Sequence, residues 1–383
     1  MIDVKKREEC CGCTACFNIC PAHCITMEKD AEGFLYPVVQ EEKCIRCGLC
    51  NKVCPMQSKK EREKEREQEE TKGYAVYAKE ETIRETSTSG GVFPLIAENV
   101  IKNGGAVFGC AFDSEFVVEH ILVQNSLEIK KLQGAKYSQS DLKDSFIRIR
   151  ELLNAGKGVL FSGTPCQIEG LKNFLRKSYE NLFLIDVVCH GVPSPMVWEN
   201  YKAFQEKTYA SSIENISLRN KDFGWKDYRV KIGFRNGKTY ISRHWDDTYM
   251  KTYIKGYISR PSCYQCQFRQ WHRESDLTLG DFWGIEQVVP QWNDDKGISL
   301  VMVHTEKGKR MLESISDRIE SKEVSKEVAV QKNPSIIMPG EIPENREKFW
   351  KILAQKGYSG AVNKYVLDSL REKAKNVIGR IKR

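Results

Sequence analysis

The chain lacks any apolar run long enough to cross a bilayer. The longest runs, such as NLFLIDVV, stop at about eight residues, whereas a membrane helix needs about 20. The N-terminal residues MIDVKKREEC pass from charge directly to cysteine, without the apolar stretch of a signal peptide. We therefore expect a cytoplasmic protein with no integral membrane segment, in a compartment where thiols stay reduced.

Two nucleotide-binding fingerprints are also missing. Neither G-x-G-x-x-G nor G-x-x-x-x-G-K occurs in the sequence, which argues against a Rossmann dinucleotide site and against a P-loop. The net charge is +8, and residues 73–383 hold the whole excess, with 47 basic and 38 acidic residues. Such a surface suits an anionic substrate, a phosphate-bearing cofactor or an acidic protein partner. No basic motif stands out, so nucleic acid is not an expected partner.

Cysteine is what the chain has in excess, with 15 residues, five of them inside EECCGCTACFNICP. A chain of 383 residues can build a hydrophobic core without disulfide staples, and we expect thiols in a reducing compartment to bind metal rather than pair. The spacing repeats, as Cys10-x2-Cys13-x2-Cys16-x3-Cys20-Pro21 and as Cys44-x2-Cys47-x2-Cys50-x3-Cys54-Pro55.

This repeat is the bacterial ferredoxin spacing for two 4Fe–4S clusters, where the last cysteine of each run binds the other cluster. The first cysteine set is therefore Cys10, Cys13, Cys16 and Cys54, and the second cysteine set is Cys44, Cys47, Cys50 and Cys20. Zinc explains isolated C-x-x-C pairs, but it does not need two identical four-cysteine runs that both end in proline. We interpret the leftover Cys11 and Cys24 as small buried filler; the alternative for Cys11 is a reactive thiol or an alternative ligand.

Four segments differ in composition. Residues 1–57 are dense in cysteine, with two short strands expected within 24–39, and residues 58–72 are an almost wholly charged linker. From residue 73 to about residue 205, strands and helices alternate, which predicts a parallel or mixed sheet covered by helices. A hairpin around Asn236-Gly237 follows, and residues 341–383 form a helical, basic tail. The predicted fold class is α+β with α/β: a ferredoxin-like domain at 1–57, then a larger mixed α/β domain at 73–340.

The large domain has its own candidate ligands. We define a third cysteine set as Cys166, Cys189, Cys263 and Cys266, because its members follow strand ends or form a C-x-x-C pair. Ligands gather at such strand ends in α/β sheets, so the set is a candidate for a third cluster; zinc and unrelated buried thiols are the alternatives. Cys110 lies inside an expected strand and is assigned to the core.

Other motifs of the large domain leave two interpretations open. His190, next to Cys189, is either a proton donor near a redox centre or a structural histidine. TSTSGG and FSGTPCQ each precede an expected helix, so their backbone amides either hold an anion or form ordinary caps. Trp271, Phe282 and Trp283 either face a flat ring or pack into the core.

Six stretches together resemble the beta-subunit family of the coenzyme F420-reducing hydrogenases and dehydrogenases: STSGG, GAKYSQSD, VLFSGTPCQIEGLK, CHGVPSP, SCYQCQFR and SDLTLGDFWG. They occur in order from about residue 74 to at least residue 300. The chain is similar to the bacterial branch of the family, in which a two-cluster ferredoxin domain is fused in front.

The resemblance implies a flavin-binding large domain: FAD held non-covalently without a Rossmann fingerprint, and a 4Fe–4S cluster beside it. It assigns the third cysteine set to that cluster. It assigns the flavin contacts to Ser89, Gly90, Gly91, Lys136, Tyr137, Ser138, Ser162, Gly163 and Thr164. His190 is the candidate catalytic residue.

The function that the resemblance implies is a ferredoxin-linked, flavin-dependent oxidoreductase. Electrons pass between the clusters and FAD, and FAD exchanges a hydride with coenzyme F420 or another conjugated acceptor. The alternative is a non-catalytic electron-transfer subunit that delivers electrons to a partner enzyme. Expected partners are a ferredoxin or other redox protein and a small-molecule electron acceptor or donor. The direction of electron flow and self-association into a homo-oligomer are left open.

Overall fold

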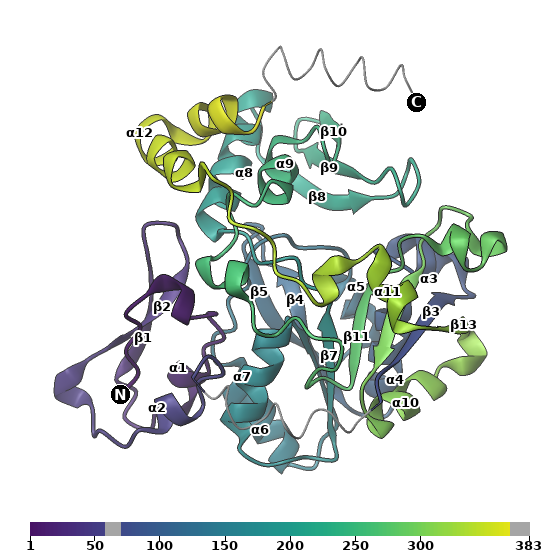
Figure 1. Ribbon diagram of the computed structural model, residues 1–383, viewed down its shortest axis with the longest axis horizontal. Helices are drawn as coiled ribbons and strands as arrows, with labels where there is room; N and C mark the ends of the chain where they lie inside the picture. The colour runs from purple at the N-terminus through teal and green to yellow at the C-terminus, as the bar shows by residue number, and fades with distance from the viewer. Residues whose placement is uncertain (58–69, 368–383) are drawn as a thin grey trace.

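The computed structural model describes residues 1–57 and 70–367, which form three parts (Figure 1). The cysteine-dense N-terminal part lies against one side of a large mixed α/β part, and a smaller sheet with its own helices lies at one end. Most of the expected linker at 58–72, and residues 368–383 of the expected tail, lie outside the described residues.

The N-terminal part contains a hairpin and two short helices. β1 (Ile25–Lys29) pairs antiparallel with β2 (Leu35–Val39), which confirms the two strands expected between the cysteine runs. α1 (Ala15–Ile19) and α2 (Leu49–Lys52) each begin within a cysteine run. The two runs therefore have the same local structure as well as the same spacing.

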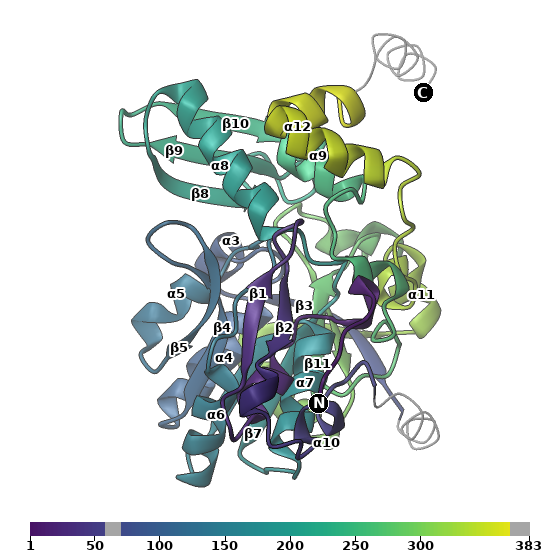
Figure 2. The same cartoon turned by 90° about the vertical axis from the view of Figure 1, so that its left-hand side faces the viewer.

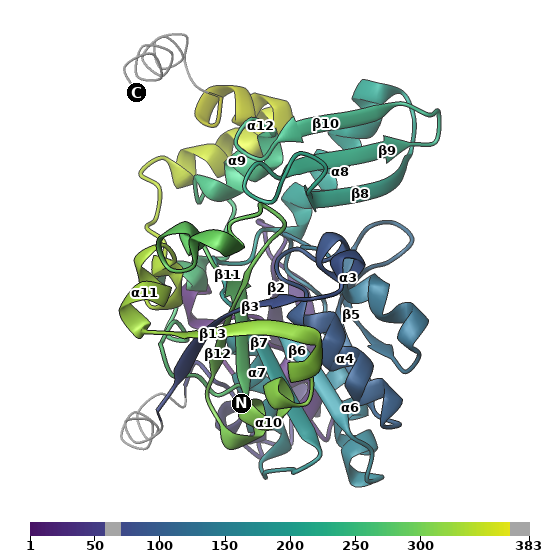
Figure 3. The same cartoon turned by 90° about the vertical axis from the view of Figure 1, so that its right-hand side faces the viewer.

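The large part is built on an eight-stranded sheet with the order β13-β3-β12-β11-β7-β6-β4-β5 (Figure 3). Its strands are β3 (Lys72–Ala78), β4 (Ala106–Phe112), β5 (Val118–Val123), β6 (Val159–Gly163), β7 (Leu182–Val187), β11 (Leu277–Asp281), β12 (Ser299–Val303) and β13 (Ile319–Val324). The central strands β4, β6, β7 and β11 are parallel, and antiparallel β5 and β12 flank them. The mixed α/β fold predicted from the sequence is confirmed, and three strands beyond residue 270 also belong to this sheet.

Helices cover both faces of this sheet. Their bounds are α3 (Glu81–Thr86), α4 (Val92–Lys102), α5 (Ile129–Leu132), α6 (Ser145–Asn154), α7 (Pro165–Leu175), α10 (Glu306–Glu313) and α11 (Lys326–Gln331). Successive residues of β4 face opposite sides. Val107 belongs to the apolar cluster that includes residues of α4, α5 and α10, whereas Phe108 belongs to the cluster that includes residues of α6 and α7. Because both faces are buried, the central strands are almost continuously apolar in sequence.

The smaller sheet has the order β10-β9-β8 and forms a separate apolar cluster with three helices (Figure 2). Its elements are α8 (Pro195–Tyr209), β8 (Ile213–Asn220), β9 (Arg229–Phe234), β10 (Thr239–Arg243), α9 (Thr248–Ile254) and α12 (Arg346–Tyr365). β9 and β10 form the hairpin expected around Asn236-Gly237. Across residues 1–57 and 70–367, none of the helices has both the length and the apolar character needed to span a bilayer.

Candidate redox site

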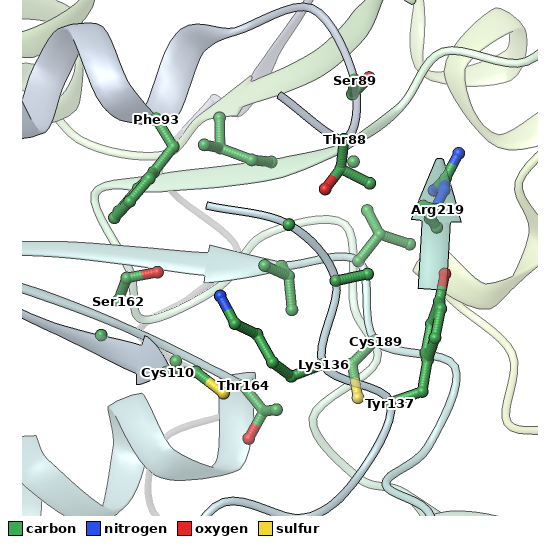
Figure 4. Close-up of a pocket in the computed structure, with 18 of the residues that line it drawn as sticks. Thr88, Ser89, Phe93, Cys110, Lys136, Tyr137, Ser162, Thr164, Cys189 and Arg219 are labelled. Atoms are coloured by element: carbon green, nitrogen blue, oxygen red, sulfur yellow. The ribbon is translucent and has the colours of Figure 1, made fainter. Parts of the chain in front are cut away.

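A cavity of about 370 Å³ lies at the carboxyl ends of the central parallel strands (Figure 4). Ser162 of β6, Val187 of β7 and Asp281 of β11 line it, so three neighbouring strands deliver residues to the same edge. The segment before α4 and the loop at 133–138 line other sides. Open α/β sheets bind ligands at this edge, and the volume is typical of a small-molecule or cofactor pocket.

Most of the residues that the sequence assigns to flavin contact line this cavity: Ser89, Gly91, Lys136, Tyr137, Ser138, Ser162, Gly163 and Thr164. Gly90 does not line it. The Gly90 N–H donates to Ser299 Oγ at 2.9 Å, and a Cβ added there would lie 2.7 Å from the Ser299 backbone nitrogen. Gly90 therefore allows the loop before α4 to pack tightly on β12.

Lys136 places a positive charge in the cavity. Its Nζ donates to the carbonyl oxygens of Lys131 at 3.0 Å and Gln133 at 2.6 Å. Burial lowers the pKa of Lys136 to about 8, and the neighbouring Cys110 opposes that shift. The assignment of Cys110 to the core is wrong, because Cys110 lines the cavity from β4.

Arg219 is a second cation in the cavity wall, and sequence patterns do not single it out. It forms an ion pair with Asp281, and its Cζ lies 4.3 Å from the ring centre of Tyr228. Its Nε and Nη2 are buried and have no hydrogen-bond partner among the described residues. Figure 4 shows the Tyr137 hydroxyl pointing toward Arg219; burial raises the pKa of that hydroxyl, and the charge of Arg219 lowers it. Unpaired buried donors are costly, so these two nitrogens mark a place for a phosphate or carboxylate oxygen.

Two histidines also line the cavity. His120 of β5 bonds through Nε2 to the Ser162 carbonyl at 3.0 Å, and burial lowers its pKa to about 4, so the ring is neutral. His190 bonds through Nδ1 to Ser335 Oγ at 3.0 Å. His120 is not among the residues predicted from the sequence, although a polar residue at an inward position of the strand VEHILV is a signal for it.

One of the three aromatic residues near residue 280 reaches the cavity. Trp283 lines it and stacks on Trp225, with ring centres 4.4 Å apart. Phe282 is buried in an apolar cluster on which Trp271 packs. The cavity therefore has one large flat ring of this group in its wall.

Cys189 belongs both to the cavity and to the third cysteine set. Burial, followed by the charge of Cys166, raises the pKa of Cys189 to about 12. Burial likewise raises the pKa values of Cys263 and Cys266. Within the set, each pair of thiolates repels, and this repulsion also raises the pKa values. Backbone N–H groups of Gly191 and Val192 donate to the sulfurs of Cys189 and Cys263, both at 3.4 Å. Four convergent thiols with N–H···S bonds suit a 4Fe–4S cluster.

The structure also gathers the first cysteine set. Burial, then the charges of Cys10 and Cys54, raise the pKa of Cys16. Cys54 comes from the second cysteine run, and Cys50 of the same run also acts on Cys16. The exchange of the last cysteines between the two clusters therefore stays a prediction. Cys11 is buried beside this set; a hydrogen bond with Cys13 raises the pKa of Cys11, and one with Cys166 of the third set lowers it.

The second cysteine set lines a single small cavity in the N-terminal part. Cys47 is exposed to solvent, unlike any other member of the three sets. Cys24 lines the same cavity, with its sulfur 3.4 Å from that of Cys20. The leftover Cys24 is thus a fifth thiol at this site.

Single metal ions are a separate question from clusters. Within the two described ranges, no group of three or more His, Cys, Asp or Glu side chains is placed to hold a metal ion. A 4Fe–4S cluster needs a wider arrangement of ligands than a single ion, because its four thiolates bind four separate irons.

Two segments of the chain match known protein families. Residues 156–327 match the family that describes the C terminus of the coenzyme F420 hydrogenase/dehydrogenase beta subunit, and residues 9–58 match the 4Fe–4S dicluster domain. The large part of the chain therefore carries the C-terminal domain of the coenzyme F420 hydrogenase/dehydrogenase beta-subunit family, and the N-terminal part is a 4Fe–4S dicluster domain. The resemblance drawn from its motifs is confirmed.

Two further comparisons concern individual proteins. The protein is similar to a chain in the solved structure of the F420-reducing [NiFe] hydrogenase complex from Methanosarcina barkeri. The TM-score is 0.45 at 12% sequence identity, over 74% of this chain and 92% of that one. A comparison with curated proteins gives no match. The family and the dicluster domain together make the chain an iron–sulfur protein of an oxidoreductase family.

Proposed function

We propose that the chain is an iron–sulfur flavoprotein oxidoreductase that passes electrons between ferredoxin-type clusters and an FAD in the cavity. The observation that carries this proposal is the position of Cys189. It lines the cavity and also belongs to the third cysteine set, so a cluster on that set would adjoin a flavin in the cavity.

The residues in the cavity fit a flavin dinucleotide. Lys136 and the unpartnered nitrogens of Arg219 offer positively charged donors for phosphate oxygens. The N-terminus of α4, an 11-residue helix, also opens on the cavity, where its free amides favour an anion. The residues proposed to hold FAD are Ser89, Gly91, Lys136, Tyr137, Ser138, Ser162, Gly163 and Thr164, with Gly90 supporting the loop behind them.

We assign a 4Fe–4S cluster to each of the three cysteine sets. The second set has the exposed Cys47 and faces an external redox protein. The first set approaches the third near Cys11, a free thiol whose pKa responds to both Cys13 of the first set and Cys166 of the third. With clusters and FAD bound, electrons would pass from the second set through the first and third sets to the flavin, or in the reverse order.

FAD supplies the exchange between one-electron and two-electron transfer. The side chains of the cavity bind and orient the flavin, and His190 beside Cys189 is the proposed proton donor. The substrate is a small conjugated acceptor, with coenzyme F420 as one candidate. Without such a substrate, the same arrangement serves a non-catalytic electron-transfer subunit.

Protein purified without oxygen is expected to contain about twelve irons and one FAD per chain, because three cubanes hold four irons each. Iron, sulfide and released flavin are measured on the denatured protein. Zinc in place of iron, or a colourless supernatant, would contradict the proposal. Protein reduced with dithionite is then offered oxidised acceptors, F420 included; turnover identifies an enzyme, whereas reduction of a protein partner alone identifies the electron-transfer subunit.

A further inference from the structure

Arg260 is a fully buried cation with no carboxylate partner. Its exposure is 0%, and its guanidinium forms no ion pair with Asp or Glu in the part of the chain that the structure describes. The Cys263 N–H donates to the Arg260 carbonyl at 2.9 Å, so the arginine lies next to a member of the third cysteine set as well as to Cys10. Because an uncompensated buried charge is strongly unfavourable, the thiolates of the two adjoining cysteine sets are the natural counter-charge of Arg260.

The guanidinium joins the N-terminal part to the large part. Nε donates to the Cys10 carbonyl at 2.7 Å, and Nη2 donates to the Leu35 carbonyl at 3.0 Å. Nη1 donates to Gln139 Oε1 at 2.9 Å, and Gln139 Nε2 donates to the Cys11 carbonyl at 3.1 Å. Two backbone carbonyls of the first cysteine run are thus held by one arginine and one glutamine of the large part.

The two parts also fit closely around this arginine. A Cβ added at Gly12 would lie 2.8 Å from Arg260 Nη1, and one added at Gly170 would lie 2.8 Å from the Cβ of Cys13. Gly170 belongs to α7, the helix that carries Cys166. The first and third cysteine sets therefore face each other across a tight contact, with Arg260 beside it.

We propose that Arg260 is a positioning residue that acts as the shared counter-charge of the two clusters on the first and third cysteine sets. The inference rests on the proposed function, because it requires the third cluster. A cubane with four thiolates is an anion that gains a further negative charge on reduction, so a fixed cation nearby raises its reduction potential. When one electron leaves one cluster and arrives at the other, the total charge facing Arg260 stays the same. Transfer between the two clusters then needs no movement of counter-ions.

Redox titration followed by electron paramagnetic resonance tests this role in the full-length protein. In Arg260→Gln, the equilibrium constant for reduction of the two facing clusters should fall about tenfold, or 59 mV for a one-electron couple. Arg260→Lys keeps the charge and should keep most of the potential. The cluster on the second cysteine set is the internal reference and should not shift. If Arg260→Gln does not fold, Arg260→Met, which keeps the apolar stem, is the second neutral variant, with the same expected shift.

Arg346, the first residue of α12, provides the matched control, because it also holds the N-terminal part in place but has a carboxylate partner. Its Nη1 donates to Glu32 Oε1 at 2.9 Å, and its Nη2 donates to the Ser259 carbonyl at 3.0 Å. Arg346→Gln should weaken the contact without shifting any potential. Equal shifts in Arg260→Gln and Arg346→Gln, or no shift in Arg260→Gln with full iron content, would overturn the role of Arg260. Only two clusters in the wild-type spectrum would instead overturn the third cluster of the proposed function.

Discussion

Cys263→Ser should lose about four irons per chain and keep a flavin that the ferredoxin-type clusters no longer reduce. Cys263 interacts with every other member of the third cysteine set, and its sulfur accepts the Val192 N–H at 3.4 Å. Serine is a poor ligand for iron in this setting, so the third cluster should not assemble. Iron and sulfide analysis, with the flavin spectrum recorded after reduction through a ferredoxin, measures both effects.

Cys110→Ser is the matched control for this loss. Cys110 also lines the cavity, but it lies outside all three cysteine sets, so its replacement should leave the iron content unchanged. Full iron content in Cys263→Ser would show that the third set binds no cluster. Loss of all iron would show that the clusters do not assemble independently.

Lys136→Met should weaken FAD binding by at least about tenfold near pH 7. A charged hydrogen bond is worth about 1.5–3 kcal/mol, which corresponds to one or two decades in affinity. Wild-type affinity should also decline as the pH rises above about 8, because burial lowers the pKa of Lys136 to about 8 and the neutral amine no longer attracts phosphate. His120, with a pKa of about 4, and Cys110, with a pKa of about 11, do not titrate in this range.

Calorimetric titration of FAD into flavin-free protein, repeated between about pH 6 and pH 9.5, measures affinity and its pH dependence. In Lys136→Met the pH dependence should weaken together with the affinity; Lys221, with a pKa of about 8 and its Nζ 3.4 Å from the Ser89 carbonyl, accounts for what remains. Lys131→Met is the control, because Lys131 is exposed and pairs with Glu128, while its backbone carbonyl still accepts from Lys136. A Lys136→Met protein with wild-type affinity and pH profile would exclude Lys136 from the flavin site.

The parts of the site that follow from local sequence were predictable. The ferredoxin spacing predicts that Cys54 joins the run that begins at Cys10, and in the structure Cys54 and Cys50 both come near enough for their charges to act on Cys16. The strands and helices up to residue 205 also follow from alternation, because each is short and bounded by turn residues. The third cysteine set depended on the resemblance, since the separate turns that carry its members meet only in the folded sheet.

What the sequence could not predict depends on pairing across the chain. β12 inserts between β3 and β11, and its sequence SLVMV is a buried run that has no period to distinguish strand from helix. The position of Arg219 in the cavity wall could not be predicted, because its ion-pair partner Asp281 comes from a different strand. The local sequence ISRPSCYQC gives no sign that Arg260 is buried. Its burial depends on the contact with Cys10, 250 residues away in the sequence.

The close approach of Gly170 to Cys13 has a consequence for kinetics. Because α7 packs directly on the first cysteine run, the N-terminal part is fixed in place and is not a swinging arm that docks and releases. Electron transfer inside the molecule then needs no movement of the N-terminal part, so its rate should be insensitive to solvent viscosity and to dilution. Only the encounter with an external redox protein should slow down when the solvent viscosity is raised.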